Sequence, residues 1–532
     1  MNYKILLIYI ISISWNISFS QNQFQFTIGG TNDELTRSII KANDNEYVFA
    51  GETKSFGAGL SDMYIVKFTS SGSLSWMFAV GGTGNDVSMS VIQTSDGGFA
   101  LAGYTNSFGA GDYDFYIVKL NSSGSIQWSK TIGGTGTEYA YSIKQTNDGG
   151  FIAAGFTYTY GAGDADAFFV KLDGNGNIQW SKTVGRSFED QAYSVVVTSD
   201  GGFAATGESH FGGGNADMYL IKLDANGNLQ WTRTVGGPNN DRAWNIIQSS
   251  DGGYGIAGWG NSYGSGDYDM YCAKFDVNGS LQWTRTLGGA NAESASSIIQ
   301  TTDGGFLISG GSNSFSGNND NIYIAKIDAI GVYSWSRIIG GANYEESTSM
   351  INTPNNGFLI GGCTSSFGSG GKDMFAVKFD SSGYTCANMI LPPTNSGIGG
   401  ILSNPTSSLS SPTPTISTPP TQIVSGGTLT QLCLVGLEMV DIEIPQDFHL
   451  YQNFPNPFNP ETNIIFSIPK EGNVNIRIFN LSGKEVTILF KGNCKAGTYK
   501  VKWKPEQFPS GVYFYKLETS NYSETKKMLL IK

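Results

Sequence analysis

Histidine and long apolar segments are scarce in this 532-residue chain, and their scarcity excludes several functions. The only two histidines, His210 and His449, have no recognisable nucleophile partner, and no Gly-x-Ser-x-Gly elbow occurs. The only long apolar run lies at the N-terminus, so no membrane-spanning segment is expected once that run is removed. Lys and Arg number 32 against 44 Asp and Glu. This acidic balance argues against nucleic acid as a partner, because phosphate binding requires clustered basic residues.

Cysteine is also sparse. The five cysteines are scattered without metal-ligand spacing, so no zinc site is expected: Cys272, Cys363, Cys386, Cys433 and Cys494. A disulfide between Cys386 and Cys433 stays an open alternative.

The N-terminus reads as a secretory signal covering residues 1–20. Lys4 precedes the apolar run Ile5–Ile13, and the small-x-small triplet Ser18-Phe19-Ser20 predicts cleavage before Gln21.

Seven copies of one unit occupy residues 29–387. Each copy opens on a glycine, with successive spacings of 52, 52, 52, 51, 52 and 52 residues: Gly29, Gly81, Gly133, Gly185, Gly236, Gly288 and Gly340. In the second copy, four runs rich in β-branched and aromatic residues, separated by Gly, Asn, Asp and Ser, predict four short strands: 87–94, 98–105, 114–120 and 125–132. A four-stranded antiparallel unit of this size is typical of a β-propeller blade, and a solenoid is the alternative.

The ends of the repeat array favour a closed ring. The first six copies carry a tryptophan on the fourth strand, and the seventh ends at Tyr384 without one. The segment 23–28 precedes Gly29 as a fourth strand would. We therefore predict an all-β fold in which residues 21–387 form a seven-bladed β-propeller closed by this N-terminal strand.

Composition changes after the repeats. Residues 388–444 contain a Pro/Ser/Thr-rich stretch (about 391–425) that predicts an extended linker, and 429–444 stays unassigned. Residues 445–532 predict a compact, immunoglobulin-like β-sandwich with strands at 463–468, 473–480, 485–490, 498–503, 511–517 and 526–531.

Acidic residues recur at two repeat positions. The first lies five residues after each opening glycine, where a ring of carboxylates could bind a ligand: Glu34, Asp86, Glu138, Asp190, Asp241, Glu293 and Glu345. The second begins the third strand, and with preceding loop acids it gives candidate Ca²⁺ ligands: Asp112, Asp114, Asp164, Asp166, Asp267 and Asp269. The alternative is that these carboxylates accept backbone hydrogen bonds in tight turns. His210 breaks the repeat and is the remaining candidate ligand-binding residue.

Two family resemblances follow from these motifs. Residues 96–134, with Asp-Gly-Gly, Gly-Asp-x-Asp, Lys-Leu, Trp and Gly-Gly, resemble the propeller repeats of secreted bacterial proteins. The Lys-Leu-Asp-Ala-Asn-Gly-Asn-Leu-Gln-Trp run ending at Trp231 resembles quinoprotein tryptophan-docking repeats, but the adjacent cysteines that contact the quinoprotein cofactor are missing. The C-terminal 80 or so residues resemble the type A sorting domain of the type IX secretion system, through Asn456, Pro457, Phe458, Asn459 and Pro460 with Gly511, Tyr513, Lys526 and Lys527. That resemblance implies export across the outer membrane by the type IX machinery.

Together these observations predict an extracellular or surface-exposed propeller that binds a glycan or protein, or acts as a scaffold. A residue repeated seven times favours structure over catalysis, because an enzyme needs one asymmetric site. The alternative function is a secreted polysaccharide-degrading enzyme that uses acids on one propeller face. The sequence establishes no cofactor, and Ca²⁺ is the one candidate.

Overall fold

The computed structural model describes residues 23–531 apart from 211–213, 316–318, 495, 504, 506–507 and short stretches between 386 and 444. The predicted signal peptide lies outside the described residues, and so does Cys386. The described part is all-β, as predicted, and its only helical element is the single 3-10 turn η2 (Pro354–Asn356).

Four-stranded antiparallel units repeat along residues 24–379. Their first strands are β2 (Glu34–Lys41), β6 (Asp86–Gln93), β10 (Glu138–Gln145), β14 (Asp190–Val197), β18 (Asp241–Gln248), β22 (Glu293–Gln300) and β26 (Glu345–Asn352). Their second strands are β3 (Tyr47–Thr53), β7 (Phe99–Thr105), β11 (Phe151–Thr157), β15 (Phe203–Ser209), β19 (Tyr254–Gly260), β23 (Phe306–Ser312) and β27 (Phe358–Thr364).

The outer half of each unit is equally regular. The third strands are β4 (Asp62–Phe68), β8 (Asp114–Leu120), β12 (Asp166–Leu172), β16 (Asp217–Leu223), β20 (Asp269–Phe275), β24 (Asn321–Ile327) and β28 (Asp373–Phe379). The fourth strands are β5 (Leu74–Gly81), β9 (Ile126–Gly133), β13 (Ile178–Gly185), β17 (Leu229–Gly236), β21 (Leu281–Gly288) and β25 (Tyr333–Ile339). Turns such as Asp96-Gly97-Gly98 join second strands to first, and Gly97 adopts φ 81°, which favours glycine.

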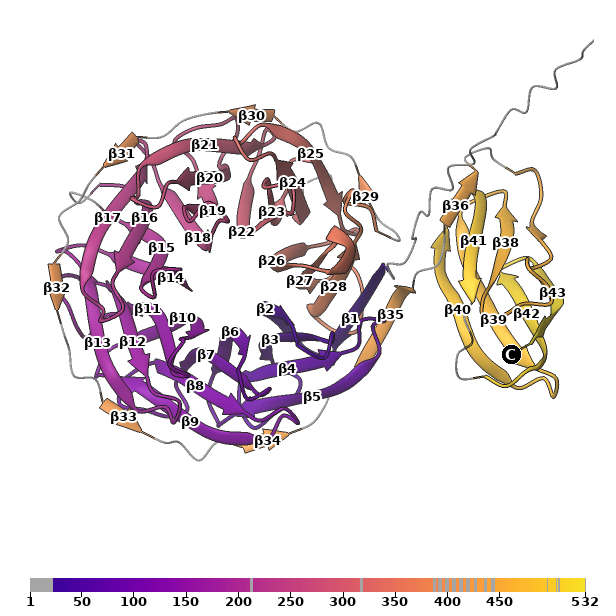
Figure 1. The fold of residues 1–532 in the computed structure, drawn as a ribbon, viewed down its shortest axis with the longest axis horizontal. Coiled ribbons are helices and arrows are strands. Elements are labelled where there is room, and N and C mark those ends of the chain that lie inside the picture. Colours follow the sequence, from indigo (N-terminus) through magenta and orange to yellow (C-terminus); the bar gives the residue numbers. More distant parts are fainter. Residues whose placement is uncertain are drawn as a thin grey trace, which may run out of the picture.

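Figure 1 shows the seven sheets side by side around a ring, with the first strands innermost. Each innermost strand contacts the next one in chain order, and β26 contacts β2. A serine or asparagine on each innermost strand accepts a hydrogen bond from a neighbouring strand's backbone amide, as Ser90 does from Ile143, or contacts the neighbour's side chain, as Ser194 does with Asn245. The last of these bonds runs from the Ile39 amide to Ser349, across the junction between the last and first units.

The fourth strand of the seventh unit comes from the N-terminus. Strand β1 (Phe24–Gly29) pairs antiparallel with β28, which is the place the sequence predicts for it. Phe24 and Phe26 are fully buried, and the Phe26 ring lies 4.8 Å from that of Phe68 in the first sheet. The two ends of the repeat array therefore meet in one sheet and one hydrophobic cluster.

The repeated tryptophans pack between sheets. Each contacts an aromatic residue on the second strand of the following sheet, for example Trp128 with Phe151 at 5.8 Å and Trp180 with Phe203 at 5.9 Å. The third-strand lysines are likewise structural, since Lys119 and Lys171 each pair at 2.8 Å with the aspartate of their own sheet's Asp-Gly-Gly turn.

Short strands of the segment predicted to be an extended linker are paired with the ring. These strands run backwards around the outside, each adding a fifth strand to one sheet (Figure 1). These edge strands are β29 (Met389–Ile390), β30 (Asn395–Gly397), β31 (Ile401–Ser403), β32 (Ser408–Ser410), β33 (Thr415–Ser417), β34 (Gln422–Val424) and β35 (Thr428–Leu434). Composition misses this pairing because backbone hydrogen bonds to an exposed sheet edge need little apolar surface.

Because the segment 389–434 covers these edges, we predict that it keeps the chain soluble. Replacing residues 389–434 with a glycine–serine linker of equal length is expected to lower the thermal midpoint and to cause reversible self-association, because outer strands such as β9 and β13 would expose unpaired backbone groups. Thermal melts and analytical ultracentrifugation measure both effects. An unchanged melting curve with a strictly monomeric chain would contradict the prediction.

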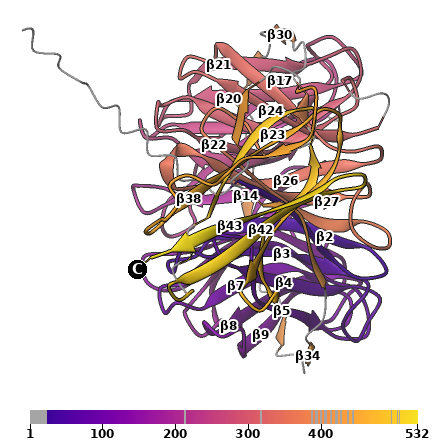
Figure 2. The ribbon, with the colours of Figure 1, turned by 90° about the vertical axis from the view of Figure 1, so that its right-hand side faces the viewer.

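The C-terminal domain is built from two four-stranded sheets. One has the order β36 (Glu438–Asp441), β41 (Gly497–Trp503), β38 (Thr462–Ile468), β37 (His449–Leu450). The other has the order β40 (Glu485–Cys494), β39 (Gly472–Asn480), β42 (Gly511–Thr519), β43 (Ser523–Leu530). The six predicted strands are all present, and β36 extends the domain to residues that the sequence leaves unassigned. Figure 2 shows these strands in yellow, in front of the ring.

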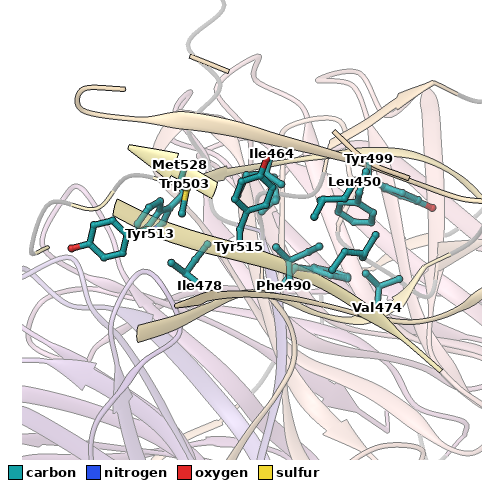
Figure 3. Close-up of a cluster of buried hydrophobic side chains, with 14 of the residues drawn as sticks. Leu450, Ile464, Val474, Ile478, Phe490, Tyr499, Trp503, Tyr513, Tyr515 and Met528 are labelled. Carbon is teal, nitrogen blue, oxygen red and sulfur yellow. The ribbon is translucent and has the colours of Figure 1, made fainter. Parts of the chain in front are cut away.

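Side chains from both sheets fill the core of this domain. Ile464, Tyr499 and Trp503 from one sheet meet Ile478 and Tyr515 from the other (Figure 3). Alternation of buried and partly exposed residues along β39 and β42 puts every second side chain into this core.

Candidate functional site

The seven acids at the entrance of the innermost strands, here called the inner acids, are buried within turns. All seven are at most 2% exposed, and each accepts a hydrogen bond from a backbone amide four residues earlier. Glu138 illustrates the pattern, accepting from the Gly134 amide at 2.7 Å and from the Thr157 hydroxyl at 2.7 Å. This geometry favours the hydrogen-bonding alternative over direct ligand contact.

The aspartate that begins a third strand lies beside the inner acid of the next sheet. At five junctions both carboxyl groups flank the opening glycine, and a β-carbon on Gly81 would lie 2.2 Å from Asp62 Oδ1 and 2.6 Å from Asp86 Oδ2. The opening residue is therefore glycine because the Asp62 carboxyl group occupies the space of a side chain. In the sixth sheet Asn321 takes the place of the aspartate, beside Glu345.

Burial and the facing carboxylate together raise the pKa of these aspartates. Desolvation is the larger cause, and it raises the pKa of Asp62, Asp166, Asp269 and Asp373 to about 6, with the nearby inner acid adding repulsion. The pKa of Asp114 is raised by the same causes.

The paired aspartates predicted as Ca²⁺ ligands differ in their burial. Asp114, Asp166 and Asp269 are buried and hydrogen-bonded to their own loop amides, for example Asp114 Oδ2 to the Ala110 amide at 2.9 Å. Their loop partners Asp112, Asp164 and Asp267 are exposed. None of the six belongs to a described group of three or more His, Cys, Asp or Glu side chains whose ligand atoms lie close together.

A cavity of about 930 Å³ lies among the innermost strands, and all seven of them line it. Every innermost strand has a β-bulge at the same place, three residues after the inner acid. Because a bulge redirects a side chain, all seven bulged residues line the cavity: Arg37, Met89, Tyr141, Tyr193, Trp244, Ser296 and Thr348. We call this space the central cavity.

One side of the central cavity is aromatic and the other is not. Tyr193 and Trp244 stack with ring centroids 4.3 Å apart, and Tyr141 lies 5.1 Å from Tyr193. Tyr139 and Phe156 extend this aromatic wall within the third sheet. Ser296 and Thr348 occupy the same backbone position in the sixth and seventh sheets, so the asymmetry comes from side chains alone.

A charged cluster adjoins the aromatic wall and includes His210. The ligand atoms of Glu189, Glu208 and His210 lie within 4.8 Å of one another. Glu208 is 2% exposed, with Oε2 lying 2.5 Å from Arg242 Nε and Oε1 lying 2.6 Å from the Tyr193 hydroxyl. His210 Nε2 lies 3.7 Å from Glu189 Oε2. The set could hold a transition metal, but Arg242 already neutralises Glu208.

Of the predicted ligand-binding residues, His210 belongs to this charged cluster. The wall residues were missed because the prediction rested on positions that are acidic in every copy. The signal that could have found them is divergence: aligned copies place Arg, Met, Tyr, Tyr, Trp, Ser and Thr at one position of a strand that otherwise repeats closely.

The two halves of the predicted sorting signal come together in the C-terminal domain. The Phe458 side chain is 1% exposed, its amide donates to the Leu529 carbonyl, and its carbonyl accepts from the Ile531 amide. Asn456 Oδ1 accepts from the Leu529 amide at 2.9 Å. Pro457, Asn459 and Pro460 thus lie in a segment held against the last strand, which carries Lys526 and Lys527, while Tyr513 is buried and donates to the Pro509 carbonyl.

Comparison with protein families identifies the family of this C-terminal domain. Residues 452–532 match the family described as the secretion system C-terminal sorting domain. The C-terminal domain is a type IX sorting domain. It indicates export to the cell surface or beyond, and implies interaction with the type IX machinery. Among the described residues no helix is long and apolar enough to cross a membrane.

The remaining comparisons are distant. The regulatory protein FlaEY of Caulobacter vibrioides is 27% identical over 138 residues, which is 23% of this chain and only 14% of that protein. A protein of unknown function from Dyadobacter fermentans is 13% identical, with a TM-score of 0.38 over 68% of this chain and 99% of its own. A β-1,2-mannobiose phosphorylase from Listeria innocua is 9% identical, with a TM-score of 0.25 over 67% and 91%. None of them assigns a function to the ring.

Proposed function

We propose that the ring is a seven-bladed β-propeller that binds a glycan against the aromatic wall of its central cavity, after export directed by the sorting domain. The cyclic contacts of the innermost strands and the pairing of β1 with β28 support the propeller. The single observation that carries the binding role is the stack of Tyr193 and Trp244, with Tyr141 beside it, at bulged positions. Flat aromatic faces suit the apolar faces of sugar rings, and the hydroxyl side chains of Ser296 and Thr348 line the same cavity.

The test is binding of the full-length exported chain to a glycan array, with Trp244→Ala and Tyr193→Ala compared with wild type. Truncating a central aromatic contact typically costs about 2 kcal/mol or more, so affinity is expected to fall roughly 30-fold. Phe454→Ala, which removes a side chain that is 78% exposed in the sorting domain, is the matched control. Wild-type affinity in both wall variants would refute the proposed site.

Calcium is expected to make little difference to binding. The inner acids already accept hydrogen bonds in their turns, so a cation would have to displace those donors. Repeating the array with a chelator checks this expectation. A chelator-sensitive signal would restore the predicted Ca²⁺ role of the acidic residues.

The cluster of Glu189, Glu208 and His210 favours the second candidate, a polysaccharide-degrading enzyme, because it places two carboxyl groups beside the same wall. Chromatography of oligosaccharides incubated with the wild-type chain and with Glu189→Gln distinguishes this candidate. Product formation that the Glu189→Gln variant loses would replace binding by catalysis.

A further inference from the structure

Lys144 occupies a position that is otherwise apolar in the repeat. It lies six residues after the inner acid of the third sheet, where the other six sheets carry aliphatic residues: Ile40, Ile92, Val196, Ile247, Ile299 and Ile351. The central cavity is lined by Lys144 and by all of these except Ile92. One ammonium group is therefore inserted into an aliphatic band of the cavity wall.

Lys144 also differs from the six third-strand lysines that form ion pairs with carboxylates. The third-strand lysine Lys119 donates to Asp96, Gln127 and the Leu120 carbonyl. Among the described residues, in contrast, no carboxylate lies within 4.0 Å of the Lys144 ammonium, although the side chain is half-buried. Burial alone lowers its pKa. A half-buried charge without a partner lowers the stability of the folded chain. We therefore expect such a charge to serve a function other than stability.

The charges that face the cavity are few. Besides Lys144, its lining contains Arg37 and Glu346 as charged residues. Arg37 is already paired with Glu52 at 2.8 Å, and Glu346 accepts from the Tyr344 hydroxyl at 2.6 Å. In a chain with a formal net charge of −12, Lys144 is thus the cation left available to a ligand inside the cavity.

We propose that Lys144 binds an anionic group of the ligand, so that the glycan recognised by the aromatic wall is an acidic one. Lys144 lies three residues beyond the bulged Tyr141 on β10, or about 10 Å along the strand. A sugar stacked on Tyr141 and Trp244 can therefore extend a carboxylate or sulfate of a neighbouring unit toward the ammonium. This inference rests on the proposed glycan site and names its substrate class.

The experiment compares calorimetric binding of three probes to the full-length chain: an oligogalacturonide, its methyl ester, and a sulfated oligosaccharide. The Lys144→Met variant keeps the length of the side chain and removes its charge. We expect it to bind the acidic probes about tenfold or more weakly and the neutral ester as wild type does. Lys144→Arg is expected to restore most of the affinity, and Lys54→Met, at an exposed lysine paired with Asp33, is the control.

A second readout separates ligand binding from a structural role. Because no described carboxylate pairs with the ammonium, Lys144→Met is expected to raise the melting temperature of the unliganded chain while removing the stabilisation that acidic probes give to wild type. Equal affinity of wild type and Lys144→Met for the acidic probes would overturn the inference, and retained binding of the ester would then leave the glycan site standing. If no glycan binds, melting in acetate and sulfate tests the anion site alone, and the absence of any Lys144-dependent stabilisation overturns it. The carboxylate and sulfate arms identify which anion is bound.

Discussion

Replacing Asp62 with asparagine is expected to stabilise the ring at pH 8 and to leave its stability nearly unchanged at pH 4. Asp62 is 1% exposed, accepts from the Ala58 and Gly59 amides, and faces the Asp86 carboxylate. Its pKa is raised to about 6, so at pH 8 the folded protein keeps an unfavourable charge. Asparagine mimics the protonated form, and Asn321 shows that the ring accepts it at this position. A pKa unit corresponds to about 1.4 kcal/mol, which gives a gain of roughly 1–3 kcal/mol.

The stability of the wild-type chain should depend on pH for the same reason. Carboxyl groups with a raised pKa bind protons more tightly in the folded state, so stability is lost as pH rises from about 4 through 6. In the opposite sense, lysine-paired aspartates such as Asp96 and Asp148 have a pKa lowered to about 2. Their contribution is present above pH 4 and is lost as pH falls toward 2. We therefore expect maximum stability near pH 4.

Urea unfolding of the full-length chain at a series of pH values, followed by tryptophan fluorescence, measures both effects. Asn321→Asp is the matched reverse variant and is expected to destabilise at pH 8 but not at pH 4. A stability profile that is flat between pH 4 and 8, or an Asp62→Asn variant that is less stable at pH 8, would show that the junction carboxyl groups do not repel as their positions imply.

Phe26→Ala is expected to cost about 3–5 kcal/mol of stability, because Phe26 is fully buried and closes the ring. Its ring lies 5.0 Å from that of Phe24 and 4.8 Å from that of Phe68, so the truncation opens a cavity between the last and first sheets. Since β1 also supplies the fourth strand of the seventh sheet, we expect limited proteolysis to release the N-terminal strand first.

The control for Phe26→Ala is Phe188→Ala, at a loop side chain that is 42% exposed. It is expected to change stability by less than about 0.5 kcal/mol. Urea denaturation measures both variants. Equal small effects would mean that β1 is not part of the folded ring and that the seventh sheet is completed in another way.

Much of the fold could be predicted because the same pattern of strands and turns occurs in every repeat. The second-copy strands were placed within a residue or two of β6 to β9, since turn glycines and alternating apolar residues mark strand ends locally. The missing fourth strand of the last copy and the matching segment before Gly29 placed β1 beside β28. The sorting signal was found because its proline-rich motif is specific.

The binding candidates were predicted less well. The inner acids drew attention because they repeat, yet a carboxylate such as Glu138 is 0% exposed, and repetition marks its structural use. His210 was found because it departs from the repeat, and the same reasoning applied to the bulged positions would have found Tyr141, Tyr193 and Trp244. A bulge cannot be read from the strand sequence, because it depends on the register of two paired strands.

The sequence by itself determined the repeating unit, the strand order within it, the closing strand and the export domain, because these depend on local propensity and periodicity. Only the tertiary structure decided which side chains share a space. It put the aromatic wall and Lys144 around a single cavity and the Glu208 cluster beside Tyr193, although these residues come from separate strands. It also wound the segment 389–434 around the outer edges. Both outcomes depend on closing seven sheets into a ring, which brings residues about 50 positions apart into contact and leaves outer backbone groups to be paired.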